Sequence, residues 1–151
     1  MKIYRIAHCK HINDMTGTGG LYTSGRWHNK GVRILYFSEH VSLAKLEVLT
    51  NANSLLKNMC LLTVSILENV SIETKLIKDL PKGWDTYPYT HLLSGITAKW
   101  LSSNKTAILK VPSAQSENEY NYLINPLHVD ATKITIVSTE KVTFDSRLQL
   151  R

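Results

Sequence analysis

The chain has 151 residues, of which 43% are hydrophobic and 20% charged, a composition that excludes an intrinsically disordered protein and predicts a single domain over residues 1–151. No apolar run reaches the roughly 20 residues that a membrane-spanning helix needs, and the N-terminus has no apolar stretch long enough for a signal peptide. We therefore expect a cytoplasmic protein with no membrane association. The net charge of +6 favours anionic partners, although the basic residues are dispersed and a solvated basic surface explains them equally well.

The N-terminal third is predicted to form two strands and one helix. Residues 2–7 alternate between apolar and polar side chains, as a half-buried strand does. A glycine-rich loop follows over residues 13–31, and residues 32–38 form a near-continuous apolar run that is typical of a strand. A helix is predicted over about residues 42–57, with a serine just before it or at its start as a candidate N-cap.

The middle of the chain continues with strands and a second helix. Residues 59–67 and 70–77 are strand candidates. Segment 79–89 contains both proline and glycine and is predicted to be a loop. Residues 90–103 are predicted to form a helix that tolerates Gly95.

Three more strands are predicted over residues 106–113, 120–125 and 132–138, and the end of the chain, residues 140–150, is predicted to be a strand or a short tail. Strands and helices do not alternate regularly, and this order disfavours a doubly wound fold. It favours one α+β domain with mainly antiparallel sheets, flanked by a few helices.

Cysteine and histidine usage predicts neither a disulfide framework nor a metal site. The chain has two cysteines, Cys9 and Cys60, which are too few for such a framework. In the expected compartment both would be reduced thiols. His8, Cys9 and His11 lie close together, but no second ligand pair stands at a zinc-like spacing.

Glu47 is the first residue that could carry chemistry. On the predicted helix it shares the flank of Leu43 and Ala44, beside the buried stripe rather than on the solvated face. A carboxylate there is costly unless it is paired or used. The structural alternative is a boundary glutamate hydrogen-bonded to a neighbouring loop.

The glycine-rich loop and the strands beside it hold further candidates. Arg26, which follows Gly25, can present its planar guanidinium to a phosphate or a carboxylate, with a surface salt bridge as the alternative. Trp27 is expected to anchor the loop by packing, and Tyr36 to be a core aromatic with a satisfied hydroxyl. Arg5 in the first strand reaches either into a cleft or into solvent.

The C-terminal half adds polar residues around strand ends. Ser113 directly follows a predicted strand end, where side chains often line sites. Asn121, Asn125 and His128 are polar residues among aromatic ones, and each by itself is more simply structural. The sequence contains no GxSxG elbow, Walker loop, HExxH motif or CxxC pair, so several common enzyme classes lose their usual support.

Taken together, these segments resemble the RES-domain family, which is named after an arginine, a glutamate and a serine. The resemblance extends from residue 4 to residue 148 and rests on the segments GRWHNKG, ILYFS, SLAKLEVL and KVPSAQSENEYNYLINPLH. His28 departs from the family pattern, in which asparagine directly follows GRW. Here Asn29 comes one place later, and the sequence offers no role for His28.

The resemblance implies a fold similar to the ADP-ribosyltransferases and a bacterial toxin that consumes NAD⁺ by cleaving its nicotinamide–ribose bond. NAD⁺ is then a substrate, and no cofactor or metal is expected. Matching motif to motif implies that the catalytic residues are Arg26, Tyr36 and Glu47. The implied substrate-binding residues are Arg5, Trp27, Ser113 and Asn125.

These residue types suit NAD⁺ chemically. Arg5 and Arg26 can hold the pyrophosphate with paired hydrogen bonds. Tyr36, or less readily Trp27, offers an aromatic face to the nicotinamide. Glu47 can face the positive charge that develops on the ribose as the glycosidic bond breaks, while a serine hydroxyl orients the nicotinamide amide or the ribose.

The resemblance also implies a partner, a DNA-binding antitoxin of the Xre type, and a toxin that does not itself bind nucleic acid. Whether water, phosphate or a protein accepts the ADP-ribose stays open, as does the oligomeric state, for which a homodimer is one option. A basic RNA-binding protein or ribonuclease is a rival reading, suggested by the charge, six histidines and seven tyrosines. A non-catalytic interaction module is another, and it requires that Arg26, Tyr36 and Glu47 do not share one cleft.

Overall fold

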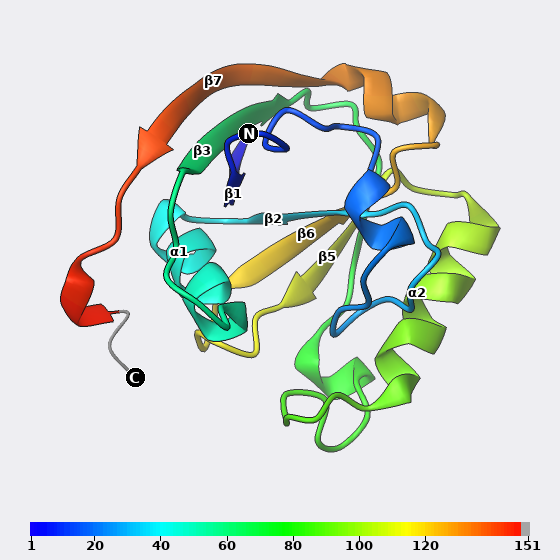
Figure 1. The fold of residues 1–151 in the computed structure, drawn as a ribbon. Coiled ribbons are helices and arrows are strands. Elements are labelled where there is room, and N and C mark those ends of the chain that lie inside the picture. The colour runs from blue at the N-terminus through cyan, green and yellow to red at the C-terminus, as the bar shows by residue number, and fades with distance from the viewer. Residues whose placement is uncertain (149–151) are drawn as a thin grey trace.

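The computed structural model describes residues 1–148, which form one seven-stranded sheet, two α-helices and four short 3₁₀ helices. The strands and helices are β1 (Lys2–His8), β2 (Leu35–Ser38), α1 (Val41–Asn51), β3 (Met59–Ile66), β4 (Ile72–Thr74), α2 (His91–Ser103), β5 (Ile108–Pro112), β6 (Tyr120–Ile124) and β7 (Ile134–Val142). Their order across the sheet is β4-β5-β6-β2-β1-β3-β7 (Figure 1). Every neighbouring pair is antiparallel except β4 and β5, so the predicted α+β domain with a mainly antiparallel sheet is confirmed.

The first helix is shorter than predicted because an asparagine ends it. Instead of reaching residue 57, α1 stops at Asn51, whose Nδ2 donates to the backbone oxygen of Glu47 at 2.8 Å. Asparagine side chains compete with backbone hydrogen bonding in this way. Ala52 already has an extended backbone, so the chain leaves the helix there.

Strand pairing also changes the bounds of four predicted elements. The strand predicted over residues 32–38 is reduced to β2. The strand predicted over residues 70–77 shrinks to β4, which pairs in parallel with β5 and does not turn back on β3. β7 extends to Val142 because it pairs with β3 along its length. The segment predicted as a strand or tail over residues 140–150 is divided between β7 and a 3₁₀ helix over Ser146–Leu148, and residues 149–151 lie outside the described part.

The sheet carries a hydrophobic core on each face. Along β6, Tyr122 belongs to one core and Leu123 to the other, because successive side chains of a strand point to opposite faces. α2 packs Trp100 into the core that contains Leu123. Asn121 lies on the Leu123 face and donates to Glu47 of α1, so both helices cover the same side of the sheet (Figure 1).

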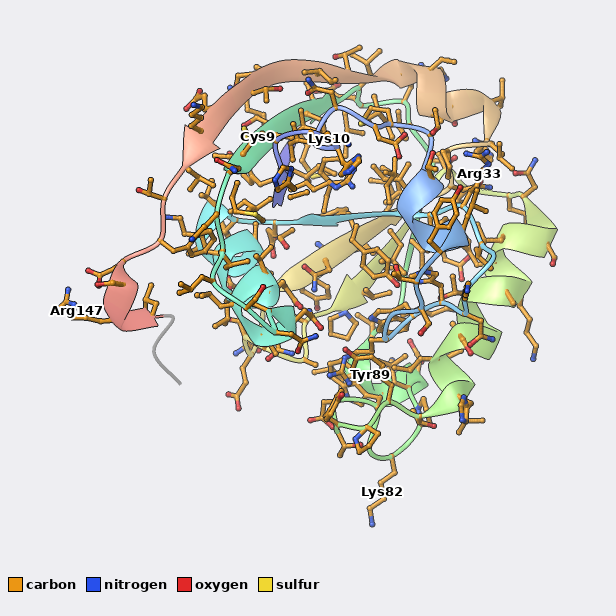
Figure 2. All side chains as sticks on the ribbon, in the orientation of Figure 1. Cys9, Lys10, Arg33, Lys82, Tyr89 and Arg147 are labelled. Carbon is orange, nitrogen blue, oxygen red and sulfur yellow. A yellow bond between two sulfur atoms is a disulfide. The ribbon has the colours of Figure 1, made fainter. Side chains whose placement is uncertain are left out.

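The expectation that Cys9 and Cys60 are separate thiols is wrong, because the structure joins them in a disulfide (Figure 2). Ala7 pairs with Cys60 across β1 and β3, and the amide of Cys9 donates to the backbone oxygen of Asn58 at 2.8 Å. The two cysteine Cα atoms are therefore 4.9 Å apart, within the range that a disulfide spans. Strand register produces this proximity, and the sequence separation of 51 residues does not reveal it.

Gly20 is the position in the glycine-rich loop at which we expect a side chain to be tolerated least. A Cβ there would lie 2.1 Å from the backbone oxygen of Val32, whereas a Cβ on Gly19 would meet nothing within 4 Å. The obstacle is backbone, and the backbone oxygen of Gly20 also accepts from the amides of Gly31 and Val32.

Gly20→Ala should therefore lower the free energy of unfolding by about 1–3 kcal/mol, the usual cost of forcing extra volume into a packed region. Gly19→Ala is the matched control and should change it by less than about 0.5 kcal/mol. Urea titration of both variants measures the difference, and equal effects would contradict the prediction.

Candidate active site

A cleft of about 600 Å³ opens on the side of the sheet that carries both helices. Its wall is formed by β1, β2, β6 and α1, by the loop over residues 23–28, and by Tyr89 from the segment between β4 and α2. Figure 2 shows Tyr89 between the two helices. Polar and charged side chains from distant parts of the chain therefore meet in one place.

The loop over residues 23–28 makes a tight turn that separates the roles of two neighbouring residues. The amide of Gly25 donates to the backbone oxygen of His28 at 3.0 Å, and these two residues form an isolated antiparallel bridge. Arg26 and Trp27 occupy the tip. Arg26 faces the segment that carries Tyr89, while Trp27 is 3% exposed and packs into the core under α2.

Arg26 ties the opposite rim of the cleft to this loop. Its Nη1 donates to the backbone oxygens of Trp84 and Thr86, each at 2.9 Å. Its guanidinium lies over the ring of Tyr89, with 4.7 Å from Cζ to the ring centroid. The Tyr89 hydroxyl in turn donates to Oδ1 of Asn51 at 3.1 Å. The cleft is thus bridged from the glycine-rich loop to the end of α1.

Glu47 enters the cleft from α1 and is held by two side chains from the strands. Ser113 Oγ donates to its Oε1 at 3.0 Å, and Asn121 Nδ2 donates to the same oxygen at 2.6 Å. Asn121 is itself oriented by Ser38, whose Oγ donates to Oδ1 of Asn121 at 2.8 Å. Both donors reach Oε1, and the arrangement fixes the carboxylate in one rotamer while it faces the cleft.

Tyr36 on β2 and His28 on the loop contact each other within the cleft wall. His28 Nδ1 lies 2.7 Å from the Tyr36 hydroxyl, and the ring centroids are 5.5 Å apart. Burial raises the pKa of the Tyr36 phenol, which keeps it neutral, although a backbone hydrogen bond from Trp27 acts in the opposite direction. Burial also disfavours the charged form of His28 and so lowers the pKa of its imidazole.

Arg5 on β1 supplies the second cation of the cleft wall. Its Nη1 donates to the backbone oxygen of Asp14 at 2.9 Å, and the side chain is half-buried. Burial lowers the pKa of Arg5, while the nearby charge of Asp14 raises it. Arg5 and Arg26 make the cleft suited to an anion, with Glu47 as the one acidic side chain among its described lining residues.

Five of the seven predicted site residues line this cleft: Arg5, Arg26, Trp27, Tyr36 and Glu47. Ser113 lies just behind the wall and contacts Glu47. Asn125 is not brought to the cleft. It follows the other end of β6, where its Nδ2 donates to Asn104 and its Oδ1 accepts the amide of Leu127.

Sequence reasoning missed the contributions of Asn121, Tyr89 and Asn51. Asn121 had a detectable signal, because a buried asparagine within an apolar strand must find polar partners. Tyr89 and Asn51 carried no such signal in the sequence. Tyr89 lies in a loop, and Asn51 lies at the end of α1, which the sequence placed at residue 57.

Within residues 1–148, no group of three or more His, Cys, Asp or Glu side chains is placed to hold a metal ion. Over the same residues, no helix has the length and apolar character needed to cross a membrane.

Comparisons with known proteins agree over almost the whole chain. A family model described as the RES domain matches residues 2–145. The Prs ADP-ribosylating toxin of Sphingobium sp. (strain YBL2) is 36% identical over 140 residues, which cover 90% of this chain and 87% of that protein. Toxin Res of Photorhabdus laumondii subsp. laumondii is 35% identical over 152 residues, which cover 98% of this chain and 97% of that protein.

A solved structure shares the fold at much lower identity. One chain of the M. tuberculosis MbcT–MbcA toxin–antitoxin complex superposes on this chain with a TM-score of 0.78 at 12% identity. The match covers 94% of this chain and 84% of that chain. At this identity the likeness concerns the fold.

Proposed function

The chain belongs to the RES domain family, and from this membership and the cleft we propose that it is the toxin of a toxin–antitoxin pair that consumes NAD⁺. The reaction is cleavage of the nicotinamide–ribose bond. With water as acceptor, NAD⁺ and water give ADP-ribose, nicotinamide and a proton; with phosphate, ADP-ribose leaves as its phosphate ester. The observation that carries the proposal is the convergence of Arg26, Tyr36 and Glu47 on one cleft.

Glu47 is suited to stabilising the transition state of this cleavage. The leaving nicotinamide is already cationic in the substrate and departs without a general acid. Positive charge then develops on the ribose, and a carboxylate fixed against it lowers the barrier. Ser113 and Asn121 hold Oε1 of Glu47, so the other oxygen, Oε2, is the one we assign to a ribose hydroxyl.

The aromatic and cationic walls suit the rest of NAD⁺. Tyr36 offers a face for the nicotinamide, and Tyr89 replaces the buried Trp27 as the second aromatic surface of the cleft. Arg26 uses Nη1 for two backbone oxygens, and we assign its Nε and Nη2 to the pyrophosphate, with Arg5 as the second cation.

Mass analysis of the products of NAD⁺ with purified protein tests the proposal. ADP-ribose, or its phosphate ester when phosphate is present, together with free nicotinamide is the expected result. Intact NAD⁺ after hours, with and without phosphate and cell extract, would overturn it.

Transfer of ADP-ribose to a protein is the second candidate reaction. It is favoured by the similarity to one relative that is named an ADP-ribosylating toxin. It shares the cleavage step and the residues assigned above. A mass increase of one ADP-ribose on a protein of the cell extract, with nicotinamide released in equal amount, would identify this acceptor in the same experiment.

The partner follows from the same membership. We propose that a DNA-binding antitoxin of the Xre type blocks the cleft, and that the pair acts in the cytoplasm, where NAD⁺ is available. The net charge of +6 suits an acidic partner segment.

Ser113→Ala should lower kcat for NAD⁺ cleavage by roughly tenfold to a hundredfold, because a hydrogen bond to a charged group is worth about 1.5–3 kcal/mol. The substitution leaves Glu47 held by Asn121 alone. Ser102→Ala on the exposed side of α2 is the control and should be neutral. Nicotinamide release measures both rates, and wild-type kcat in Ser113→Ala would show that Asn121 suffices.

A further inference from the structure

His28 is a buried side chain of the cleft wall to which the proposed reaction assigns no role. It is 6% exposed, and both ring nitrogens have partners. Nδ1 lies 2.7 Å from the Tyr36 hydroxyl, and Nε2 lies 3.0 Å from the backbone oxygen of Thr23.

These two partners determine the tautomer of the neutral ring. A carbonyl oxygen only accepts, so the hydrogen must be on Nε2, which donates to Thr23. Nδ1 is then unprotonated and accepts the hydroxyl hydrogen of Tyr36. The direction of the Tyr36 hydroxyl is therefore set by His28.

Close packing by two glycines fixes the His28 ring. A Cβ on Gly25 would lie 3.2 Å from Nδ1 of His28 and 3.2 Å from the Tyr36 hydroxyl. A Cβ on Gly20 would lie 3.3 Å from Nε2. The hydrogen bond from the amide of Gly25 to the backbone oxygen of His28 closes the same turn. The ring thus has one orientation, and it transmits that orientation to Tyr36.

We propose that neutral His28 is a positioning residue for Tyr36, and that the toxin cleaves NAD⁺ only while this ring is uncharged. The proposal rests on the proposed function for its activity readout, but the hydrogen bond between the two rings can be tested without it. His28 itself does not need to touch the substrate.

Protonation disrupts this arrangement for a geometric reason. It places a hydrogen on Nδ1, so this nitrogen becomes a donor and the Tyr36 hydroxyl oxygen must accept from it and turn its own hydrogen elsewhere.

Charge adds to the effect. Besides His28, the charged and titratable groups of the surrounding wall are Tyr4 and Arg5 on β1, Arg26, Tyr36 on β2, Glu47 on α1 and Tyr89. Two of these are cations and Glu47 is the one acid. Burial lowers the pKa of His28 below its ordinary value of 6.5, so the ring is neutral at pH 7 and becomes charged only as the pH falls through that lowered value.

The first test is nitrogen NMR of the histidine side chains in the wild-type protein between about pH 5 and about pH 8. We expect His28 to be protonated at Nε2 alone at neutral pH and to titrate below its ordinary range. A neutral ring protonated at Nδ1 would overturn the proposal whatever the activity of the protein.

The second test is the pH dependence of kcat/KM for NAD⁺, which reports on groups of the free enzyme. For the wild type, kcat/KM should fall about tenfold per pH unit below the pKa of His28. In His28→Asn, the amide oxygen accepts from Tyr36 at every pH. The acidic fall attributed to His28 should vanish, with neutral-pH activity within about threefold of wild type.

His28→Ala removes the acceptor and should lower kcat/KM roughly tenfold at every pH. His91→Asn, at the exposed start of α2, is the matched control and should keep the wild-type profile. Retention of the wild-type acidic fall in His28→Asn, or full activity in His28→Ala, would overturn the proposal. If wild-type protein leaves NAD⁺ intact, the proposed function fails, while the NMR result still decides the His28–Tyr36 bond.

Discussion

Glu47→Gln should reduce NAD⁺ cleavage by about a hundredfold to a thousandfold, the usual loss when one preorganised electrostatic contact to a transition state is removed. The substitution keeps the shape of the side chain. Its amide oxygen can still accept from Ser113 and Asn121, which hold Oε1 in the native site. What disappears is the negative charge beside the ribose.

The measurement is the rate of nicotinamide release, with circular dichroism and urea titration to establish that the variant is folded. Glu140→Gln on the exposed part of β7 removes one acid far from the cleft and should retain wild-type activity. If Glu47→Gln keeps more than about a tenth of the wild-type rate, transition-state stabilisation by this carboxylate is wrong.

Arg26→Lys is expected to lower kcat/KM for NAD⁺ roughly a hundredfold, mainly through KM, because a lysine cannot reproduce the planar fork. One ammonium group cannot donate to Trp84 and Thr86, lie over the ring of Tyr89 and still present N–H groups to a pyrophosphate. Positive charge alone is therefore insufficient. The bridge across the cleft should open.

A structural readout separates this loss from a simple loss of charge. Figure 2 shows Lys82 projecting from the segment that Arg26 holds. Release of that segment should speed tryptic cleavage after Lys82 in Arg26→Lys. Arg33→Lys is the matched control, because Arg33 lies away from Tyr89 in Figure 2 and donates only to the backbone oxygen of Thr16 among its described contacts. Equal cleavage rates and equal KM in both variants would contradict the prediction.

The cleft also explains why the glycine-rich loop combines residues that rarely form turns. The bridge between Gly25 and His28 places Arg26 and Trp27 at its tip. The tryptophan is driven into the core by its apolar surface. The arginine, pointing the other way, spans the cleft. One short turn thus anchors the loop and presents a cation.

Sequence alone determined the kinds of elements and most of their positions. The alternation in residues 2–7 and the apolar run at 32–38 correspond to β1 and β2, since burial of one or both faces leaves its period in the sequence. Family motifs singled out Arg26, Tyr36 and Glu47, which the structure brings together. Local pattern by itself favoured a structural role for each of them.

Tertiary structure alone decided the partners of these residues. The contact of Glu47 with Ser113 and Asn121 and the disulfide of Cys9 join segments that are far apart in the chain. The orientation of Tyr36 by His28 depends on how the loop folds back against β2. Hydrogen bonds and disulfides act over a few ångströms, and neither composition nor periodicity encodes such distances. His28, which had no role in the sequence, acquires one only from the two oxygens that its ring nitrogens face.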